Sequence, residues 1–471
     1  MNNPFDFLQH NADTNPNGVF VRSPQTTLTN AEALVEVKKL AYELRRLGVT
    51  AGQVVALDLP DALNILFTEA IYHEAAISTV VPNGYAGGVP IAWLFTNRSM
   101  ELEGAMSVTV DARFLQQVDQ NPYGIRPSDE QLDTLRIVFS SGTTGTPKAI
   151  ALGYKALLPF EDALETWFEG DPFLVLMDMG TPWGFGGFFL AAQGGKPYLS
   201  VGGADPATIV RIAADNAVTS IKGSPAQIAG FVAQAEAQQV TLPSIETVYV
   251  GGTVMPTGVA QRMRAVADGC RIYSQYGATE TGIATGRLYE TDDPSDAGQL
   301  MQGARVEVVD DNDVVLPVGS PGRVRHQTPG MVDGYIGDPG ASALAFRDGW
   351  FYPGDLGFFR PDGGLTLTGR ESEMLNAGGV KVDPNRLDGF ALDDEKVIDA
   401  ASFDYASASG IHEIGLALVT EDGVDVQALI ARLKGEFGTA APQLIARVPE
   451  IPRNAMGKPM RRRLAERFSE S

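Results

Sequence analysis

The spacing of apolar residues along the first 250 positions alternates between a helical period and short strand-like runs. Apolar side chains recur at helical spacing from Ala31 to Leu44, and Gly48 is a suitable stop, which predicts a helix over residues 29–48. The apolar run that follows at 54–59 predicts a strand. The same alternation predicts further helices near 62–76, 155–169, 206–216 and 225–238 and strands near 77–81, 173–177 and 246–250. Strands that alternate with helices indicate an α/β body with a largely parallel sheet.

Hairpin patterns replace this alternation after residue 300. Two β-branched runs flank an Asp-Asn-Asp turn within residues 306–316 and predict one hairpin. A second hairpin is predicted over residues 356–368, where Pro-Asp-Gly-Gly forms the turn. A β-rich piece therefore follows the α/β body.

The last hundred residues look separable from the rest. They carry their own strand-like run at 411–420, a helical pattern at 426–437 and a basic tail. We therefore predict an α/β fold class with two domains. A large, multi-subdomain N-terminal domain of layered α/β sheets with a β-rich subdomain spans residues 1–370, and a small α+β C-terminal domain spans residues 371–471.

Composition and charge narrow the possible partners. Of 471 residues, 44% are hydrophobic and 20% charged, as in globular proteins. The net charge of −22 argues against nucleic acid and anionic membranes as partners. A single cysteine, Cys270, excludes an internal disulfide and a multi-cysteine zinc site. The first residues lack the pattern of a signal peptide, and no apolar run reaches about 18 residues, so we expect no membrane insertion and a cytoplasmic location.

The segment from Ser140 to Lys148 has the composition of a phosphate-binding loop. It holds two glycines, five hydroxyl residues and one lysine, and it follows an apolar run that predicts a strand. Glycines let the backbone approach phosphate oxygens, while hydroxyl groups, backbone N–H groups and the lysine bind them. The spacing is not that of a Walker A loop, and the rival interpretation is a surface linker. The candidate nucleotide-binding residues here are Ser140, Ser141, Gly142, Thr143, Thr144, Gly145 and Lys148.

Two further motifs carry side chains suited to a nucleotide. In Tyr273-Ser-Gln-Tyr-Gly-Ala-Thr-Glu-Thr281, the Tyr276 ring suits stacking on a purine, Thr279 offers a hydroxyl group to a phosphate, and Glu280 is a hard oxygen ligand for Mg²⁺. Farther along, the Asp355 carboxylate can accept two hydrogen bonds from a ribose diol, and Arg370 can donate to ribose or phosphate oxygens.

Together these motifs resemble those of the adenylate-forming superfamily, which includes acyl- and aryl-CoA synthetases, peptide-synthetase adenylation domains and firefly luciferase. Tyr276, Gly277, Thr279 and Glu280 match its segment for adenine, phosphate and metal, and Gly251 and Gly252 match its glycine pair beside adenine. Pro452-Arg-Asn-Ala-Met-Gly-Lys458 is similar to its loop whose lysine contacts the substrate carboxylate and the α-phosphate. The resemblance covers roughly residues 15–467.

The resemblance implies an ATP-dependent carboxylic acid–CoA ligase. Such an enzyme forms an acyl-adenylate with release of pyrophosphate and then a thioester with CoA, so ATP, Mg²⁺ and CoA are implied. It also implies that Lys458, Thr279 and Glu280 are catalytic, that Glu280 binds the metal, and that residues 371–471 are a mobile lid that carries Lys458.

Some positions depart from the family pattern. The hinge position two residues past Arg370 is Ser372, and Arg386 stands where a carboxylate is usual. Trp183 and Phe185 suggest either the apolar wall of an acyl pocket or core packing. Asp178 is the sole candidate partner for an α-amine and sits early for that role, which favours an acid without an amine.

The acceptor and the acid stay open at this stage. A carrier-protein phosphopantetheine is an alternative to CoA, and a degenerate nucleotide-binding protein is an alternative of a different class. A basic cluster suits either acceptor, and it consists of Arg447, Arg453, Arg461, Arg462 and Arg463. The identity and chain length of the acid and the oligomeric state do not follow from the sequence.

Overall fold

The computed structural model describes most of the chain and divides it into two compact units. The described residues are 3–82, 85, 88–140, 147–157, 171–290, 293, 295–377, 380–394, 396–406, 412–453 and 458–469. The first unit comprises Met1–Asp205, Ile212–Lys222 and Pro329–Leu344, and the second comprises Pro206–Arg211, Gly223–Thr328 and Ala345–Ser471. The predicted domain boundary after Arg370 falls inside the second unit and stays a prediction.

The first unit contains a six-stranded sheet that is parallel except at one edge. Its strand order is β6-β5-β3-β4-β7-β8, and only the β7–β8 pair is antiparallel. The strands are β3 (Val54–Asp58), β4 (Ile77–Thr79), β5 (Ile91–Thr96), β6 (Met106–Thr109), β7 (Arg136–Ser140) and β8 (Lys148–Leu152). The accompanying helices are α1 (Phe5–Thr14), α2 (Asn30–Leu47), α3 (Asp61–His73), α4 (Ala112–Asp119) and α5 (Tyr154–Leu157).

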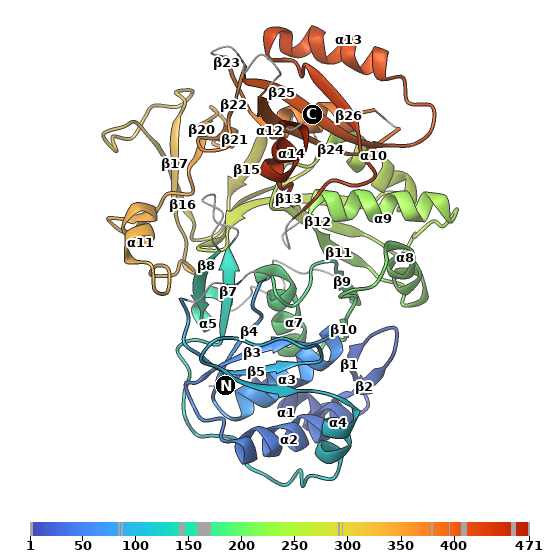
Figure 1. The fold of residues 1–471 in the computed structure, drawn as a ribbon, viewed down its shortest axis with the longest axis vertical. Helices are drawn as coiled ribbons and strands as arrows, with labels where there is room; N and C mark the ends of the chain where they lie inside the picture. Colours follow the sequence, from blue (N-terminus) through green and yellow to red (C-terminus); the bar gives the residue numbers. More distant parts are fainter. Residues whose placement is uncertain are drawn as a thin grey trace. The chain divides into compact units, whose positions relative to one another are not determined.

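A second group of strands in this unit runs in the order β2-β1-β10-β9-β11 (Figure 1). β1, β10, β9 and β11 are mutually parallel, so their carboxyl ends share one edge. These strands are β1 (Val19–Arg22), β2 (Thr27–Thr29), β9 (Phe173–Val175), β10 (Tyr198–Leu199) and β11 (Ser220–Gly223). The neighbouring helices along the chain are α7 (Pro182–Gly194) and α8 (Pro206–Asp215), of which α8 is divided between the two units, and α11 (Pro339–Ala345) lies much later in the chain.

The second unit is built around a largely antiparallel sheet. Its order is β12-β13-β14-β15-β21-β20-β17-β19-β18, and β16 also pairs with β17. The strands are β12 (Thr247–Gly251), β13 (Arg271–Ala278), β14 (Gly282–Leu288), β15 (Asp296–Leu300), β16 (Arg305–Val309), β17 (Gly322–Gln327), β18 (Phe346–Arg347), β19 (Trp350–Phe351), β20 (Asp355–Phe359) and β21 (Leu365–Arg370). Its first helices are α9 (Pro225–Ala237) and α10 (Thr257–Val266).

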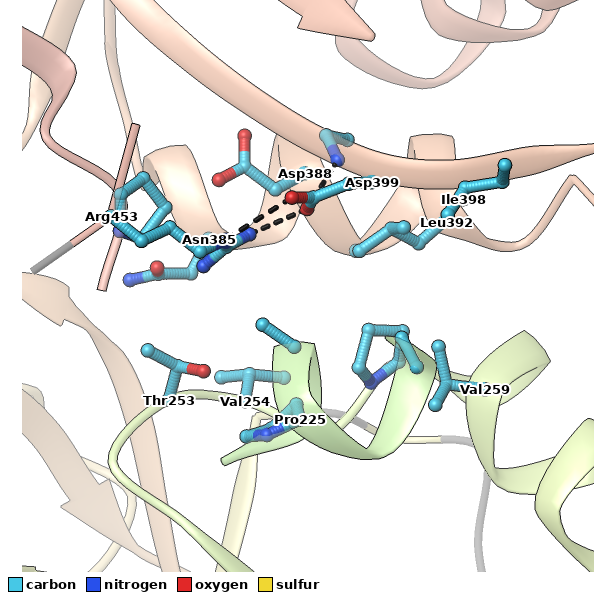
Figure 2. A pocket seen from close by; sticks show the side chains of 16 residues that line it. Pro225, Thr253, Val254, Val259, Asn385, Asp388, Leu392, Ile398, Asp399 and Arg453 are labelled. Atoms are coloured by element: carbon cyan, nitrogen blue, oxygen red, sulfur yellow. Dashed lines mark hydrogen bonds and ion pairs between the residues drawn. The ribbon is translucent and has the colours of Figure 1, made fainter. Parts of the chain in front are cut away.

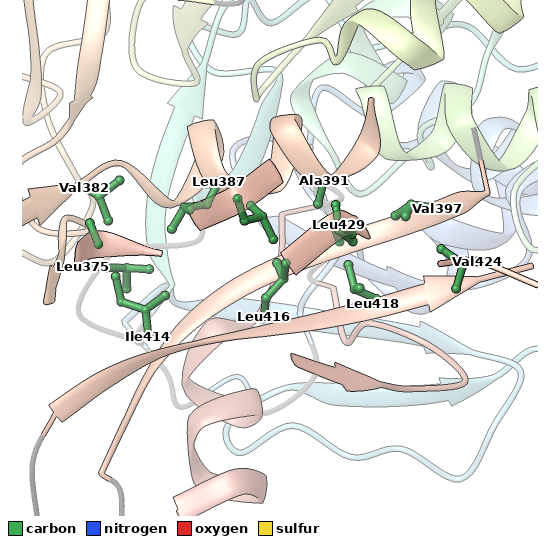
Figure 3. Packing of buried hydrophobic residues seen from close by; sticks show 13 residues of the cluster. Leu375, Val382, Leu387, Ala391, Val397, Ile414, Leu416, Leu418, Val424 and Leu429 are labelled. Carbon is green, nitrogen blue, oxygen red and sulfur yellow. The ribbon is translucent and has the colours of Figure 1, made fainter. Parts of the chain in front are cut away.

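The C-terminal part of the second unit has its own sheet and core. Helices pack on both faces of a sheet ordered β24-β25-β26. One core joins Leu387 of α12, Leu416 of β25 and Leu429 of α13 (Figure 3), and another buries Leu464 of α14 beside Phe403 of β24. The elements are β22 (Leu375–Ala377), β23 (Val380–Val382), α12 (Pro384–Leu392), β24 (Val397–Ala406), β25 (His412–Thr420), α13 (Val426–Phe437), a 3₁₀ turn (Gly438–Ala440), β26 (Leu444–Arg447) and α14 (Arg461–Ser469).

The α/β fold class predicted from the sequence is confirmed, and one predicted hairpin has a shorter second arm than expected. The segment at 306–316 turns back on itself, with backbone hydrogen bonds from the Asp310 N–H to the Val314 oxygen and from the Leu316 N–H to the Val308 oxygen. Its second arm makes only one antiparallel bridge, from Val315 to Val309, and the full ladder of β16 is with β17. The hairpin predicted at 356–368 is present as β20 and β21. None of the helices in the described part of the chain combines the length and apolarity that crossing a bilayer requires.

Candidate functional site

The predicted phosphate-binding loop closes a hairpin at the edge of the six-stranded sheet. Ser140 ends β7 and Lys148 begins β8, and the two residues are paired in register. The Lys148 ammonium nitrogen lies 4.7 Å from the centroid of the Tyr335 ring, in the same unit. The remaining predicted loop residues, Ser141, Gly142, Thr143, Thr144 and Gly145, lie outside the described residues. The strand–loop–strand context expected of this segment is thus present at both ends.

A second hairpin, β13–β14, positions the Tyr-Gly-Ala-Thr-Glu motif. Tyr276 lies near the end of β13, and Thr279 and Glu280 lie in the short connection to β14. Gly277 is required there, since a β-carbon at that position would lie 2.0 Å from the carbonyl oxygen of Gly282. Glu280 is buried, with 7% of its surface exposed. The tight turn therefore fixes the backbone that carries Thr279 and Glu280.

Asp355 is the centre of a hydrogen-bonded group that joins three strands. Its Oδ2 accepts a hydrogen bond from the Tyr276 hydroxyl at 2.7 Å, and its Oδ1 accepts one from Arg370 Nε at 2.9 Å. Asp355 and Arg370 are register partners at the start of β20 and the end of β21. Arg370 also lies 3.6 Å from a carboxylate oxygen of Glu373. The structure thus brings together the predicted stacking ring, ribose carboxylate and phosphate-binding arginine.

Lys458 belongs to the same charged group, although it is distant from the others in sequence. Burial and the nearby positive charge of Arg370 lower the pKa of Lys458, while the carboxylates of Glu373, Asp355 and Glu280 raise it. Electrostatic interactions therefore link Lys458, the predicted adenylation lysine, with Glu280 and Asp355.

Two arginines that flank Lys458 in the sequence form ion pairs with the C-terminal sheet and its helix. Arg453 Nη2 lies 2.5 Å from Asp399 Oδ1 on β24, and Arg461 Nη2 lies 2.8 Å from Asp388 Oδ2 on α12. Figure 2 shows the Arg453–Asp399 pair beside a pocket whose other wall comes from Thr253, Val254, α9 and α10. Arg453 and Arg461 are thus engaged in internal ion pairs, the exposed Arg462 pairs with Glu466 one helical turn away, and Arg463 is also exposed.

The glycine pair lies at the end of a strand that adjoins β13. Gly251 ends β12 and is the register partner of Gln275, the residue before Tyr276. Gly252 has φ of +89°, a conformation that favours glycine. The backbone of these glycines therefore runs next to the motif that carries Tyr276.

His326 is a buried neighbour of this site that the motifs did not single out. Its ring centroid lies 5.8 Å from that of Tyr276 and 5.4 Å from that of Phe351. Burial lowers the pKa of His326 to about 4, so the imidazole is neutral at pH 7. Neither ring nitrogen has a hydrogen-bond partner among the described residues. A histidine in a β-strand gives no sequence signal that separates this position from an ordinary core residue.

The predicted acyl-pocket segment divides into core and accessible parts. Phe185 is fully buried and packs on Phe188, Phe189 and the Arg136 guanidinium group, so packing is its role in this unit. Trp183 is only half-buried. The Asp178 carboxylate accepts a hydrogen bond from the backbone N–H of Gly180 at 2.8 Å, which ties it into the turn before α7.

The donor set fits a magnesium ion that shares its ligands with a nucleotide. Within the described ranges, no cluster of three or more His, Cys, Asp or Glu side chains could hold a metal by itself. Mg²⁺ commonly binds through one or two carboxylates together with substrate phosphates and water. Glu280, a buried carboxylate of this unit, would supply that ligand.

Comparison with known proteins agrees with this geometry. The profile of the AMP-binding enzyme family matches residues 97–336. A 2-hydroxy-7-methoxy-5-methyl-1-naphthoate–CoA ligase of Streptomyces carzinostaticus is 29% identical over 431 residues, covering 87% of this chain and 75% of the relative. The medium/long-chain-fatty-acid–[acyl-carrier-protein] ligase FadD10 of Mycobacterium tuberculosis is 30% identical over 366 residues, covering 71% and 66% of the two chains.

The solved structures show the same fold. The crystal structure of the anthranilate CoA ligase AuaEII in complex with anthranoyl-AMP aligns with a TM-score of 0.85 at 20% identity, covering 99% of this chain and 97% of that one. The chain belongs to the AMP-binding enzyme family. The predicted membership of the adenylate-forming superfamily is therefore confirmed, as is the predicted enzyme class, an acid–thiol ligase.

Proposed function

We propose that this chain is an ATP-dependent carboxylic acid–CoA ligase that works through an acyl-adenylate. The observation that carries the proposal is the convergence of Tyr276, Asp355, Arg370, Glu280 and Lys458 in one unit. Each of these side chains suits one part of a nucleotide that reacts with a carboxylate, and the CoA ligase among the relatives supports the choice of reaction.

Each of these residues would have a separate role in the first step. The Tyr276 ring would stack on adenine, Asp355 would accept hydrogen bonds from the ribose hydroxyls, and Arg370 would hold Asp355 in place. Glu280 would bind the Mg²⁺ that accompanies ATP, and that ion supplies positive charge beside the phosphates. Thr279 would donate its hydroxyl to the α-phosphate.

Lys458 would act on the reacting atoms. An oxygen of the acid attacks the α-phosphorus, the bond to the bridging oxygen breaks, and pyrophosphate leaves. The Lys458 ammonium group would stabilise the charge on the α-phosphoryl oxygens during this step. In the second step the thiol sulfur, after losing its proton, attacks the acyl carbonyl carbon, and AMP leaves with the electron pair of its acyl–oxygen bond.

A carrier-protein phosphopantetheine is the second candidate for the acceptor. The relative named as an acyl-carrier-protein ligase favours it, and the exposed Arg462 and Arg463 of α14 would suit an acidic carrier. We prefer CoA because the match to the naphthoate–CoA ligase covers 87% of this chain, whereas the match to the acyl-carrier-protein ligase covers 71%. ATP and CoA are cytoplasmic compounds, so the proposal includes a cytoplasmic location.

Pyrophosphate release with a panel of acids, followed by mass spectrometry of the product, tests the proposal. With free CoA we expect acyl-CoA, AMP and pyrophosphate in equal amounts. Formation of AMP and pyrophosphate without acyl-CoA for any acid would favour the carrier protein as acceptor. Binding of ATP without pyrophosphate release for any acid would instead support a degenerate nucleotide-binding protein.

A further inference from the structure

Gln275 carries a buried amide group in the middle of β13. The residue is 8% exposed, and among the residues that the structure describes none donates a hydrogen bond to its buried Oε1. Nearly all buried polar atoms in proteins have a hydrogen-bond partner, because leaving one unpaired costs free energy. Local departures from such rules are expected at functional positions, so this amide is a candidate for binding a ligand.

Both cross-strand neighbours of Gln275 are glycines. Its register partners are Gly251 on β12 and Gly286 on β14. Register partners place their side chains on the same face of a sheet, so these glycines leave the positions beside Gln275 without a side chain on either strand. A glycine inside a strand often marks a place where a ligand approaches closely. Gly252, which follows Gly251, borders open space, since a β-carbon there would meet nothing within 4 Å.

Aromatic and apolar side chains share this face of the sheet. Tyr249 and Tyr273 lie two residues earlier on β12 and β13, so they are on the face of Gln275, and their rings stack with centroids 5.5 Å apart. Met301 lies beside Gly286, where a β-carbon would be 3.3 Å from the Met301 Sδ. A thioether sulfur accepts hydrogen bonds weakly and donates none. The Met301 side chain therefore cannot satisfy the amide oxygen of Gln275.

Gln275 and Tyr276 point to opposite faces of β13, because successive side chains of a strand alternate. The proposed function assigns adenine to the Tyr276 ring and the α-phosphate to Thr279, three residues farther along the chain. In an acyl-adenylate the acid and the ribose are bonded to the same phosphorus, so they extend from it in different directions. With adenosine on the face of Tyr276, the face of Gln275 is left for the body of the acid. All of these residues belong to the second unit.

We propose that the amide oxygen of Gln275 accepts a hydrogen bond from the acid substrate, so that the preferred acids carry a hydroxyl or amine N–H group on their body. The inference rests on the proposed function, because it assigns one contact of the acid that is adenylated. An acid without such a donor leaves the buried amide unpaired, which lowers its affinity. Gln275 is a specificity residue in this role and takes no part in the bond changes.

The test compares matched acids with the full-length enzyme. The ortho, meta and para hydroxybenzoates are paired with their methyl ethers, the corresponding aminobenzoates with their N,N-dimethyl derivatives, and benzoate is the parent of both series. The kcat/KM for each acid is measured by pyrophosphate release at saturating ATP. In the wild type we expect the best hydroxy- or aminobenzoate to exceed its methylated partner and benzoate by about 10- to 100-fold, the size of one buried acceptor left unpaired.

Replacing Gln275 with Leu removes the amide while keeping a side chain of similar size. In Gln275→Leu we expect kcat/KM to fall for the preferred acid and to rise for benzoate, because no amide is then left unpaired beside an apolar ring. Opposite changes for the two acids separate specificity from damage to the fold, since a damaged protein loses activity on both. Gln261→Leu, on the exposed face of α10, is the matched control and should keep the ranking of the wild type.

Two results would overturn the inference while leaving the proposed function intact. One is a wild type that accepts benzoate or the methylated acids as well as their hydroxy and amino partners. The other is a folded Gln275→Leu variant, with a normal KM for ATP, that keeps the ranking of the wild type. If this variant does not fold, Gln275→Met takes its place, and if neither folds, the ranking of the wild type decides.

Failure of the proposed function is distinguishable from failure of this inference. If no acid gives pyrophosphate, the proposed function fails, and calorimetric titration of the same acids into the wild type and Gln275→Leu decides on Gln275. Tighter binding of a hydroxy- or aminobenzoate than of its methylated partner, lost in Gln275→Leu, would support the contact. Equal or absent binding of both members of every pair would count against it.

Discussion

Replacing Asp355 with Asn tests the centre of the proposed nucleotide site. The Asp355 carboxylate accepts hydrogen bonds from the Tyr276 hydroxyl at 2.7 Å and from Arg370 Nε at 2.9 Å, and its side chain is 13% exposed. Asn has nearly the same shape, but one of its two acceptor atoms becomes an NH₂ group that can only donate. The substitution therefore removes the negative charge and one set of lone pairs while leaving the packing nearly unchanged.

The expected loss follows from the number and type of hydrogen bonds. A hydrogen bond to a charged group contributes about 1.5–3 kcal/mol, and about 1.4 kcal/mol corresponds to a factor of ten. We expect kcat/KM for ATP to fall about 10- to 100-fold in Asp355→Asn. Arg370 keeps Glu373 at 3.6 Å as a second carboxylate, so we expect the variant to fold.

Deoxynucleotides show whether the loss arises at the ribose. Pyrophosphate release is measured with ATP, 2′-deoxy-ATP and 3′-deoxy-ATP for both proteins, which makes a double-mutant cycle between enzyme and substrate. The wild type should prefer ATP over each deoxynucleotide by about 10-fold or more, and this preference should nearly vanish in Asp355→Asn. A variant that keeps the full preference would refute the ribose assignment. Asp362→Asn, which makes the same charge change in the turn between β20 and β21, should behave like the wild type.

Three further predictions concern single residues of the second unit. Lys458→Met should slow acyl-adenylate formation by about 100-fold or more while changing thioester formation from supplied acyl-adenylate much less; equal losses in both half-reactions would remove Lys458 from the first step. Glu280→Gln should raise the Mg²⁺ concentration needed for the half-maximal rate, and an unchanged Mg²⁺ titration would exclude Glu280 as a metal ligand. Gly277→Ala should lower the free energy of unfolding by about 1–3 kcal/mol in thermal denaturation, because its β-carbon would lie 2.0 Å from the Gly282 carbonyl oxygen. The control Gly435→Ala, whose β-carbon would meet nothing within 4 Å on α13, should leave stability equal or slightly higher.

Elements specified by neighbouring residues were predictable from the sequence. The helix predicted over residues 29–48 is α2, and its start is fixed locally by a capping box between Thr29 and Glu32. Its end is fixed by Gly48 in a left-handed conformation. The helix predicted at 426–437 coincides with α13. In these cases the signals lie within a few residues of the element that they define.

Strand pairing was less predictable because it depends on residues far along the chain. The turn at 306–316 reverses the chain as its composition predicts, but its second arm forms only one bridge, and the full ladder of β16 is with β17. A local turn signal reports the reversal of the chain but not which distant strand pairs with β16. The same limit applies to the five-arginine cluster, where only the fold shows that Arg453 and Arg461 are held by Asp399 and Asp388.

The sequence by itself determined which kinds of chemistry the protein carries. Its evidence is a set of local patterns, which can be recognised without knowledge of the fold. These patterns are the hydroxyl groups and glycines around Lys148, the Tyr-Gly-Ala-Thr-Glu motif and the lysine near the C-terminus. The tertiary structure decided which of these groups meet. Four separate segments supply Tyr276, Asp355, Arg370 and Lys458. Only the pairing of β20 with β21 and the packing of the C-terminal sheet bring these polar and charged groups together. The physical reason is that a charge acts over a few ångströms in space, whatever the number of residues between the partners.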